Sequence, residues 1–427
     1  MTSRTEEASP RDPQGLASAL VDAGALTADW LPAFGAVPRE LFVPDRIWPG
    51  VADGTRQTAL VDRADDPAAW RAAVYSDVPL TTQWDDGRHR GDGLGTTPTS
   101  SSSMPRMVFS MLADLDVAHV RPGGRALEIG TGTGWNAALL AHRLGGGNVV
   151  SVEYDAQVAR TAVAHLRRAG LAATVVVGDG RLGHGAGGPY SRTIATCSVG
   201  DVPYDWVRQT EDGGIIVAPW GTGYGGEAIV RLIVEGGVAA GSFTRSSAFM
   251  RLRQQRAPRP PFAAYLRGRT WPADGVRSTT ALSPAETGGW LAQFVIGLRV
   301  PGVFWRAERY GERYGERYGE RYGERYGERY GERYGDERGS PGGAGGAYTL
   351  WLYSADTASW ATADFVPGAD GFVVVQSGPR ELWTEVEAAF RWWEREGRPG
   401  YERFGLMVDA DGQRTWLDRP GAASWPV

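Results

Sequence analysis

The sequence predicts an α/β fold with a parallel sheet, and three strand-like stretches support that prediction. The first, at 126–129, runs into a glycine-rich turn at 130–134 and then into a helical pattern of apolar residues. A second apolar strand ends at Glu153, and a third, at 174–177, ends in a Gly-Asp-Gly turn at 178–180. Apolar strands that alternate with helices are typical of a parallel sheet covered by helices on its faces.

The ends of these strands carry residues that suit an adenosyl ligand. Glu128, Glu153 and Asp179 lie at or near the carboxyl ends, where open α/β sheets bind their ligands. Glycine in the turn permits positive φ and lets a ligand lie against the backbone. The Gly-x-Gly-x-Gly spacing differs from the Gly-x-Gly-x-x-Gly of dinucleotide sites, which favours an adenosyl group with a cationic centre over a pyrophosphate. The turn and acids resemble the S-adenosylmethionine site of class I methyltransferases; a turn that binds nothing is the alternative.

Composition and charge limit the possible partners. The 427 residues, 42% of them hydrophobic, suffice for two or three domains, and the net charge of −5 argues against nucleic acid. The sequence has no apolar run of membrane-spanning length and no signal peptide. A single cysteine, Cys197, excludes an internal disulfide, and the five histidines lack metal-ligand spacing, so no metal is predicted. We expect a cytoplasmic monomer that binds neither nucleic acid nor a membrane.

Several landmarks outside the glycine turn point to one family. In order along the chain, they resemble segments of the protein-L-isoaspartate O-methyltransferases: Val37–Pro44, Tyr75-x-Asp77-x-Pro79-Leu80, Ser103-Met104-Pro105, the turn at 126–136, Gly178-Asp179-Gly180, Pro189–Ile194 and Gly213–Val217. The match covers about residues 14–255. This resemblance implies a seven-stranded, mostly parallel Rossmann-like sheet flanked by helices, S-adenosyl-L-methionine as cofactor, and methylation of isoaspartyl carboxylates in peptides and proteins.

The resemblance also assigns site residues by position. The cofactor-binding residues would be Glu128, Gly130, Thr131, Gly132, Gly134, Asn136, Glu153, Tyr154, Asp179 and Gly180, with Asp179 near the adenine. The substrate-binding residues would be Ser101, Ser102, Ser103, Met104, Val108 and Trp220, although core packing explains Trp220 equally well. The sequence departs from the family at Met104, where glutamine is usual, and in an insertion around 85–97.

The implied chemistry requires little of the protein. A carboxylate is already a nucleophile at pH 7 and a sulfonium methyl is already activated, so alignment and desolvation supply most of the rate. Ser103 is therefore assigned as a hydrogen-bond donor that orients the substrate carboxylate, not as a nucleophile. The alternative is a polar loop in which Ser103 caps the following helix.

The C-terminal part changes in composition after a proline-rich linker at 256–267. Ten of the 17 tryptophans follow Arg267, which indicates a separate α+β module over 268–427. Its elements are predicted as strands at 293–305, 348–353 and 371–375, a helix over 379–396, and a hairpin about Asp411-Gly412. The module has no part in methyl transfer itself, so substrate recognition is its expected role.

Seven tandem Glu-Arg-Tyr-Gly units occupy Glu308–Gly335. A four-residue repeat with glycine in every unit keeps no apolar face in a helix or a strand, so 308–340 is predicted as a disordered insertion between two antiparallel strands. An arginine- and tyrosine-rich surface for an acidic partner is the alternative. Disorder is also expected at residues 1–13, before a methyltransferase domain over 14–255.

Motifs in the C-terminal part of the chain, hereafter the tail, resemble those of a particular subgroup of this family. These motifs resemble those of actinobacterial isoaspartate-methyltransferase homologues associated with ribosomally made, modified peptides: Phe390–Trp393, Gly397–Pro399, Arg403–Leu406 and Gly412–Leu417. This implies methylation of an aspartate in a lanthipeptide, lasso peptide or graspetide, after which the ester cyclises to aspartimide and hydrolyses to isoaspartate. The alternatives are general repair of isoaspartyl damage and a non-catalytic peptide-binding scaffold.

Overall fold

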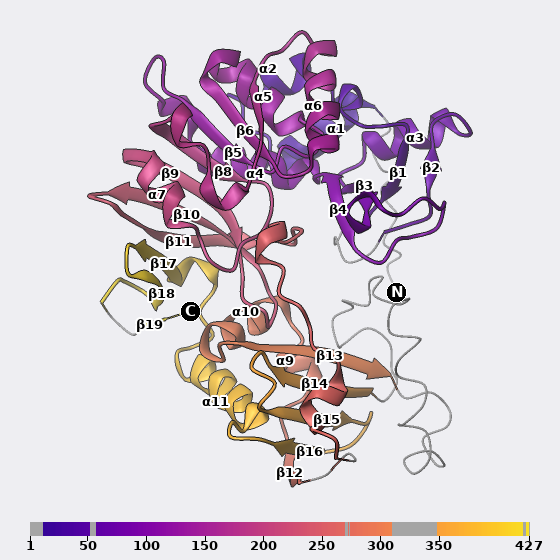
Figure 1. Cartoon of the computed structure of the whole chain (residues 1–427), viewed down its shortest axis with the longest axis vertical. Helices are drawn as coiled ribbons and strands as arrows, with labels where there is room; N and C mark the ends of the chain where they lie inside the picture. Colours follow the sequence, from indigo (N-terminus) through magenta and orange to yellow (C-terminus); the bar gives the residue numbers. More distant parts are fainter. Residues whose placement is uncertain are drawn as a thin grey trace.

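The computed structural model describes residues 12–51, 57–269, 272, 274–309, 348–421 and 424–426. Within them the central element is a ten-stranded sheet in the order β19-β18-β17-β11-β10-β9-β8-β5-β6-β7 (Figure 1). Its strands are β5 Ala126–Ile129, β6 Val149–Glu153, β7 Thr174–Val177, β8 Tyr190–Ala195, β9 Thr210–Trp220, β10 Ala228–Glu235, β11 Val238–Ser246, β17 Phe404–Asp409, β18 Gly412–Leu417 and β19 Ser424–Pro426.

The first seven of these strands form the sheet that the sequence predicted. Strands β7, β6, β5, β8 and β9 are parallel neighbours, whereas β10 and β11 add as antiparallel hairpin strands. Three helices contact the parallel strands: α5 Trp135–Leu144, α6 Ala156–Arg168 and α7 Tyr204–Gln209. The predicted mostly parallel, seven-stranded α/β sheet is thus confirmed, and strands from the tail enlarge it.

The N-terminal region forms a smaller layer beside the main sheet (Figure 1). Its antiparallel sheet has the order β2-β1-β3-β4, and helix α3 lies next to β2. The elements are α1 Pro13–Asp22, α2 Leu31–Ala36, β1 Arg46–Pro49, β2 Val61–Asp62, α3 Pro67–Val74, β3 Leu80–Trp84, β4 Pro98–Ser102 and α4 Pro105–Leu115. One apolar cluster joins Phe34, Phe109 and Trp135, so this layer packs directly on the helices of the main sheet. Residues 1–11 of the predicted disordered terminus lie outside the described residues.

The C-terminal region builds a second antiparallel sheet in the order β12-β16-β15-β14-β13. Its elements are α8 Phe262–Leu266, β12 Val276–Thr280, α9 Pro284–Thr287, α10 Trp290–Arg299, β13 Val303–Arg309, β14 Tyr348–Ser354, β15 Trp360–Phe365, β16 Phe372–Ser377 and α11 Leu382–Arg395. Helix α11 and the hairpin β17-β18 confirm two tail predictions. Strands β13 and β14 pair antiparallel, as expected for the strands on either side of the repeat, and residues 310–347 lie outside the described residues.

One tail prediction is wrong. The stretch 293–305 is not a strand, because α10 ends at Arg299 and β13 begins only at Val303. Apolar residues 291, 294, 295 and 298 fall on one helical face, and a short apolar run does not distinguish a buried helix from a buried strand by composition.

The two large sheets share one hydrophobic core. Phe294 of α10 packs against Trp220 and Phe243 of the main sheet, at ring-centroid distances of 6.4 and 4.9 Å. The same ring contacts Tyr401 and Phe404 at 5.2 and 5.9 Å. Strand β17 then pairs with β11 and so returns the tail to the main sheet. None of the helices in the described ranges is long and apolar enough to span a membrane.

Candidate active site

A pocket opens at the carboxyl ends of β5, β6 and β8. Its walls come from four parts of the chain: the serine run 99–103, the turn 129–133, the end of β6 at Glu153, and a strap at 249–256 that follows β11. The strap contributes Phe249, Met250, Arg251, Leu252, Arg253 and Arg256.

The glycine turn makes room for a ligand by omitting side chains. Gly130 and Gly132 have φ values of 92° and 53°, which L-residues with a Cβ rarely adopt. A Cβ on Gly130 would lie 2.9 Å from Oγ1 of Thr196, and one on Gly132 would lie 3.2 Å from the main-chain oxygen of Ser101. Neighbouring groups therefore leave little room for a side chain at either position, and the turn contributes backbone to the pocket lining.

Glu128 supports the turn from below. Its side chain is fully buried, and its Oε1 accepts a hydrogen bond of 2.8 Å from the amide of Asn136. The hydroxyl of Ser151 donates to the other oxygen and is itself 2.6 Å from the hydroxyl of Thr131. Burial raises the pKa of Glu128 to about 7. This carboxyl group thus connects the turn to α5 and β6 from beneath the pocket wall.

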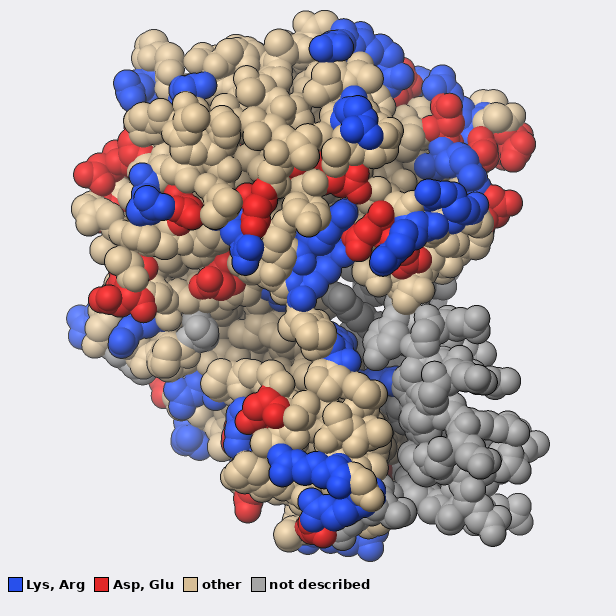
Figure 2. All heavy atoms as spheres, viewed as in Figure 1, with Lys and Arg blue, Asp and Glu red and all other residues tan. Residues whose placement is uncertain are grey.

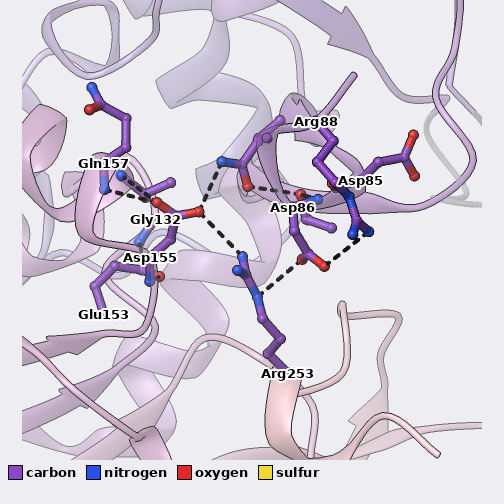
Figure 3. Close-up of polar contacts among 12 residues, drawn as sticks. Asp85, Asp86, Arg88, Gly132, Glu153, Asp155, Gln157 and Arg253 are labelled. Carbon is purple, nitrogen blue, oxygen red and sulfur yellow. Dashed lines mark hydrogen bonds and ion pairs between the residues drawn. The ribbon is translucent and has the colours of Figure 1, made fainter. Parts of the chain in front are cut away.

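Glu153 does line the pocket and holds the turn in place (Figure 3). Its Oε2 accepts from the backbone N–H of Gly132 and its Oε1 from that of Asp155, both at 3.0 Å. Burial raises the pKa of Glu153 above its ordinary value. Each carboxylate oxygen retains a lone pair for a ribose hydroxyl.

On the opposite wall, the serine run is fixed by Arg39, a residue that the sequence reasoning missed. Arg39 is 1% exposed, and its Nε donates to the hydroxyl of Ser102 at 3.2 Å. Its Nη2 donates to the main-chain oxygens of Ser102 and Ser103 at 3.1 and 2.9 Å. Further donations reach the main-chain oxygens of Val74, Ser76 and Val78. Arg39 lies within the landmark Val37–Pro44, but nothing in its local sequence shows that it contacts a segment some 60 residues away.

The mouth of the pocket is crossed by charged contacts between the insertion and the strap (Figure 3). Asp86 of the insertion accepts from Arg253 at 3.1 Å and from Arg256 at 3.0 Å. Arg253 also lies 3.6 Å from Asp155, which accepts from the amide of Gln83 at 3.1 Å. Neither Asp86 nor these arginines was among the predicted site residues.

The structure brings most of the predicted residues together. Those that line the pocket are Ser101, Ser102, Ser103, Val108, Gly130, Thr131, Gly132, Asn136, Glu153, Tyr154 and Gly180. The capping alternative for Ser103 is wrong, because Met104 is the N-cap of α4 and no side chain caps that helix. Met104 itself is not among the lining residues.

Four other predicted residues lie behind or beside the pocket wall. Glu128 supports the turn as described, and Gly134 packs against Ala162 of α6. Asp179 sits next to the lining residue Gly180 and binds the guanidinium of Arg181 at 2.7 Å. Trp220 is fully buried between Phe243 and Phe294, so the structure corrects its assignment from substrate contact to core.

The wall of the pocket also contains the protein's single cysteine. Cys197 is half-buried and lines the pocket, and burial raises the pKa of its thiol to about 12. Among the described residues there is no group of three or more histidine, cysteine and acidic side chains that could hold a metal ion.

Comparison with known proteins gives one consistent result. The family model for protein-L-isoaspartate(D-aspartate) O-methyltransferase matches residues 56–239. A protein-L-isoaspartate O-methyltransferase of Hyperthermus butylicus is 33% identical over 198 residues, which are 44% of this chain and 66% of that relative. Protein-L-isoaspartate O-methyltransferase 1 of Archaeoglobus fulgidus is 35% identical over 191 residues, covering 44% and 70%. A solved protein-L-isoaspartate O-methyltransferase structure is 20% identical, with a TM-score of 0.48 over 96% of this chain and all of the other.

The sheet order, the glycine turn and the acid at the end of β6 define a class I methyltransferase, and the bare backbone at Gly130 and Gly132 fits an adenosyl group. Within that class the chain belongs to the protein-L-isoaspartate O-methyltransferase family, whose methyl donor is S-adenosyl-L-methionine. The family model leaves the tail beyond residue 239 unmatched.

Proposed function

We propose that this protein methylates a carboxylate of an isoaspartyl or aspartyl residue in a peptide. The observation that carries the proposal is the opposition of two walls in one pocket, with the glycine turn and Glu153 facing the serine run. The main-chain oxygen of Ser101 lies 3.2 Å from the Cβ position of Gly132, so the two walls meet. A donor held on the turn and an acceptor held on the serine run would therefore share this pocket.

The protein's own residues would bind, orient and desolvate. Gly130, Gly132 and Glu153 would hold S-adenosylmethionine, which would supply an activated methyl group to a carboxylate oxygen and leave as a neutral thioether. Glu153 would accept from the ribose hydroxyls, and Asp179 would lie near the adenine. The hydroxyl of Ser103 would donate to the acceptor carboxylate and direct one oxygen at the methyl carbon. No proton moves, so the pocket needs no general base.

The apolar part of the strap would exclude water from the reacting groups. Phe249, Met250 and Leu252 line the pocket together with Val108. Removing water strengthens every charge interaction in the pocket and frees the carboxylate from its hydration shell.

For the substrate we propose a dedicated, ribosomally made and modified peptide such as a lanthipeptide, lasso peptide or graspetide. The support is the resemblance of the tail to homologues associated with such peptides, and the direct connection of the tail to the pocket through the strap. Residues 268–427 would then select the peptide. After esterification the following backbone nitrogen would attack the ester carbonyl and expel methanol, leaving aspartimide, which water opens to isoaspartate.

General repair of isoaspartyl proteins is the second candidate, because the relatives that match carry the name protein-L-isoaspartate O-methyltransferase. A non-catalytic scaffold is disfavoured by the intact turn and by Glu153. For either enzymatic function we propose a cytoplasmic monomer that acts on a peptide.

Mass spectrometry of the full-length protein with S-adenosylmethionine tests these candidates. The substrates are a generic isoaspartyl peptide and the macrocyclised precursor peptide encoded beside the gene. Gain of one methyl group followed by loss of methanol on the precursor alone would support the dedicated enzyme. Methylation of the generic peptide alone would identify a repair enzyme, and methylation of neither would remove the proposal.

A further inference from the structure

The strap that lines the pocket is unusually basic. Residues 249–269 contain six arginines and no acidic residue, although the whole chain has a net charge of −5. Three of them, Arg251, Arg253 and Arg256, line the pocket, and the strap then continues to α8 and the second sheet (Figure 1). Basic side chains are visible at the waist between the upper and lower parts of the molecule (Figure 2). The route from the pocket to the tail is therefore lined with positive charge.

At the mouth of the pocket, one carboxylate serves three guanidinium groups. Asp86 lies 3.1 Å from Arg253, 3.0 Å from Arg256 and 3.8 Å from Arg88 (Figure 3 shows it between Arg88 and Arg253). The side chains of Arg253 and Arg256 are 20% and 27% exposed, so solvent screens them only in part. Asp86 is therefore shared among three guanidinium groups rather than paired with one.

The second carboxylate near Arg253 also has other hydrogen-bond partners. Asp155 is 3.6 Å from Arg253, and its Oδ1 caps α6 by accepting from the backbone N–H groups of Gln157 and Val158 at 2.9 and 3.2 Å. Its Oδ2 accepts from Gln83. No carboxylate is paired with Arg256 in the described residues other than Asp86, which Arg256 shares.

The insertion is folded so that Asp86 reaches the strap. Asp85 accepts from the backbone N–H groups of Thr96 and Thr97 at 3.0 and 2.7 Å, which closes the insertion on itself. The N–H of Asp86 donates to the hydroxyl of Thr99 at 3.1 Å. Both aspartates have positive φ, 52° and 55°, a conformation that costs free energy in a residue with a Cβ. A strained backbone held by this many contacts is typical of a functional loop.

We propose that Arg253 and Arg256 bind a second carboxylate of the acceptor peptide, next to the one that is methylated, and that Asp86 is its resident substitute. The acceptor is then an acidic peptide, in which aspartate, glutamate or a terminal carboxylate flanks the modified residue. When the peptide binds, its carboxylate forms ion pairs with Arg253 and Arg256. These two arginines then no longer share Asp86 as their common carboxylate partner. This inference rests on the proposed methyl transfer and names the substrate class of that site.

The test uses the macrocyclised precursor peptide and an isoaspartyl hexapeptide. Each is made in three versions that differ only beside the modified residue, with glutamate, glutamine or lysine there. With the full-length protein we expect KM to be lowest for the glutamate peptide, by about fivefold to tenfold relative to glutamine, and kcat to be similar. The difference should shrink as salt rises, which packing alone would not cause. Arg256→Gln should abolish the preference, whereas the matched control Arg269→Gln, which follows α8 and is paired with Asp274, should retain it.

A second variant works in the opposite direction. Asp86→Asn removes the resident charge with little change in size and should lower KM for the glutamate peptide further. It also keeps the test decisive if Arg256→Gln fails to fold. Equal KM values for the three versions at normal turnover would overturn this inference and leave the proposed function standing. Absence of methylation on every peptide would overturn both.

Discussion

The guanidinium of Arg39 donates from Nη2 to the main-chain oxygen of Ser103 at 2.9 Å, although 64 residues separate them. The same buried side chain holds the hydroxyl of Ser102 and the carbonyl groups of the segment 74–78. The position of the serine run therefore depends on a residue that never reaches the pocket. Arg39 acts as a positioning residue for the serine run.

Replacing Arg39 tests this dependence. Arg39→Ala would leave several buried carbonyl oxygens without donors, so we expect unfolding free energy to fall by about 3 kcal/mol and kcat/KM to drop strongly. Arg39→Lys retains the charge and loses the fork of donors, so it should recover little of either. Urea unfolding and methylation kinetics measure both effects. Arg167→Ala, on an exposed face of α6, is the control and should change stability by less than about 0.5 kcal/mol.

Ser103→Ala removes a hydroxyl that lines the pocket and has no hydrogen-bond partner among the residues that the structure describes. We expect kcat/KM to fall about tenfold to a hundredfold, as for loss of one hydrogen bond to a charged group. Affinity for S-adenosylmethionine, measured by calorimetry, should stay within about twofold because the turn is untouched. An unchanged kcat/KM would exclude Ser103 from orienting the acceptor.

Asp179→Ala tests the predicted adenine site. Loss of the carboxylate should weaken S-adenosylmethionine binding by about 1.5–3 kcal/mol. Because Asp179 binds Arg181, the matched variant Arg181→Ala breaks the same ion pair and keeps the carboxylate. If both variants weaken binding equally, the ion pair matters and not a contact of Asp179 with the cofactor.

The buried carboxyl group of Glu128 should make the free energy of unfolding depend on pH. Burial raises its pKa from the ordinary 4.5 to about 7, so the folded state binds the proton more tightly than the unfolded state. The resulting stabilisation is complete below pH 4.5 and is lost as pH rises through 7, an effect on the order of 3 kcal/mol. Glu128→Gln keeps a hydrogen-bonding group and should flatten this part of the profile. Parallel urea-unfolding profiles of the two proteins between pH 5 and 8 would contradict the assignment.

The Glu-Arg-Tyr-Gly repeat can be tested by deletion. Arg309 and Tyr348 are paired across β13 and β14, so the ends of the segment 310–347 already lie side by side. The deletion must begin after Arg309, because Glu308 and Arg309 belong to β13. Replacement of 310–347 by a four-residue turn should leave turnover unchanged and raise stability by about 1–2 kcal/mol through loop closure. A large loss of turnover would show that the repeat contacts substrate.

The local parts of the fold and site were accessible from the sequence. The spacing of the glycines and of the acid that follows them predicted the turn at 130–134 and the site residue Glu153. The helical spacing of apolar residues predicted α11. Arg39 and Asp86 were not accessible, because each acts on a segment far away in the chain. Trp220 shows the same limit. It was expected in a loop at the C-terminal side of the sheet, where it could line the pocket, but it ends β9 and its ring packs against Phe294, which only the tertiary fold brings there.

The return of the tail to the main sheet has a consequence for how such proteins could diversify. The chain leaves the catalytic sheet after β11, builds the second sheet, and comes back to pair β17 with β11. The C-terminal region is therefore joined to the main sheet at two places, after β11 and again at β17, rather than at one. Cutting the chain at residue 268 would expose the edge of β11 and half of a shared core. To exchange the C-terminal region between relatives, the connection after β11 and the pairing of β17 with β11 would have to be transferred together.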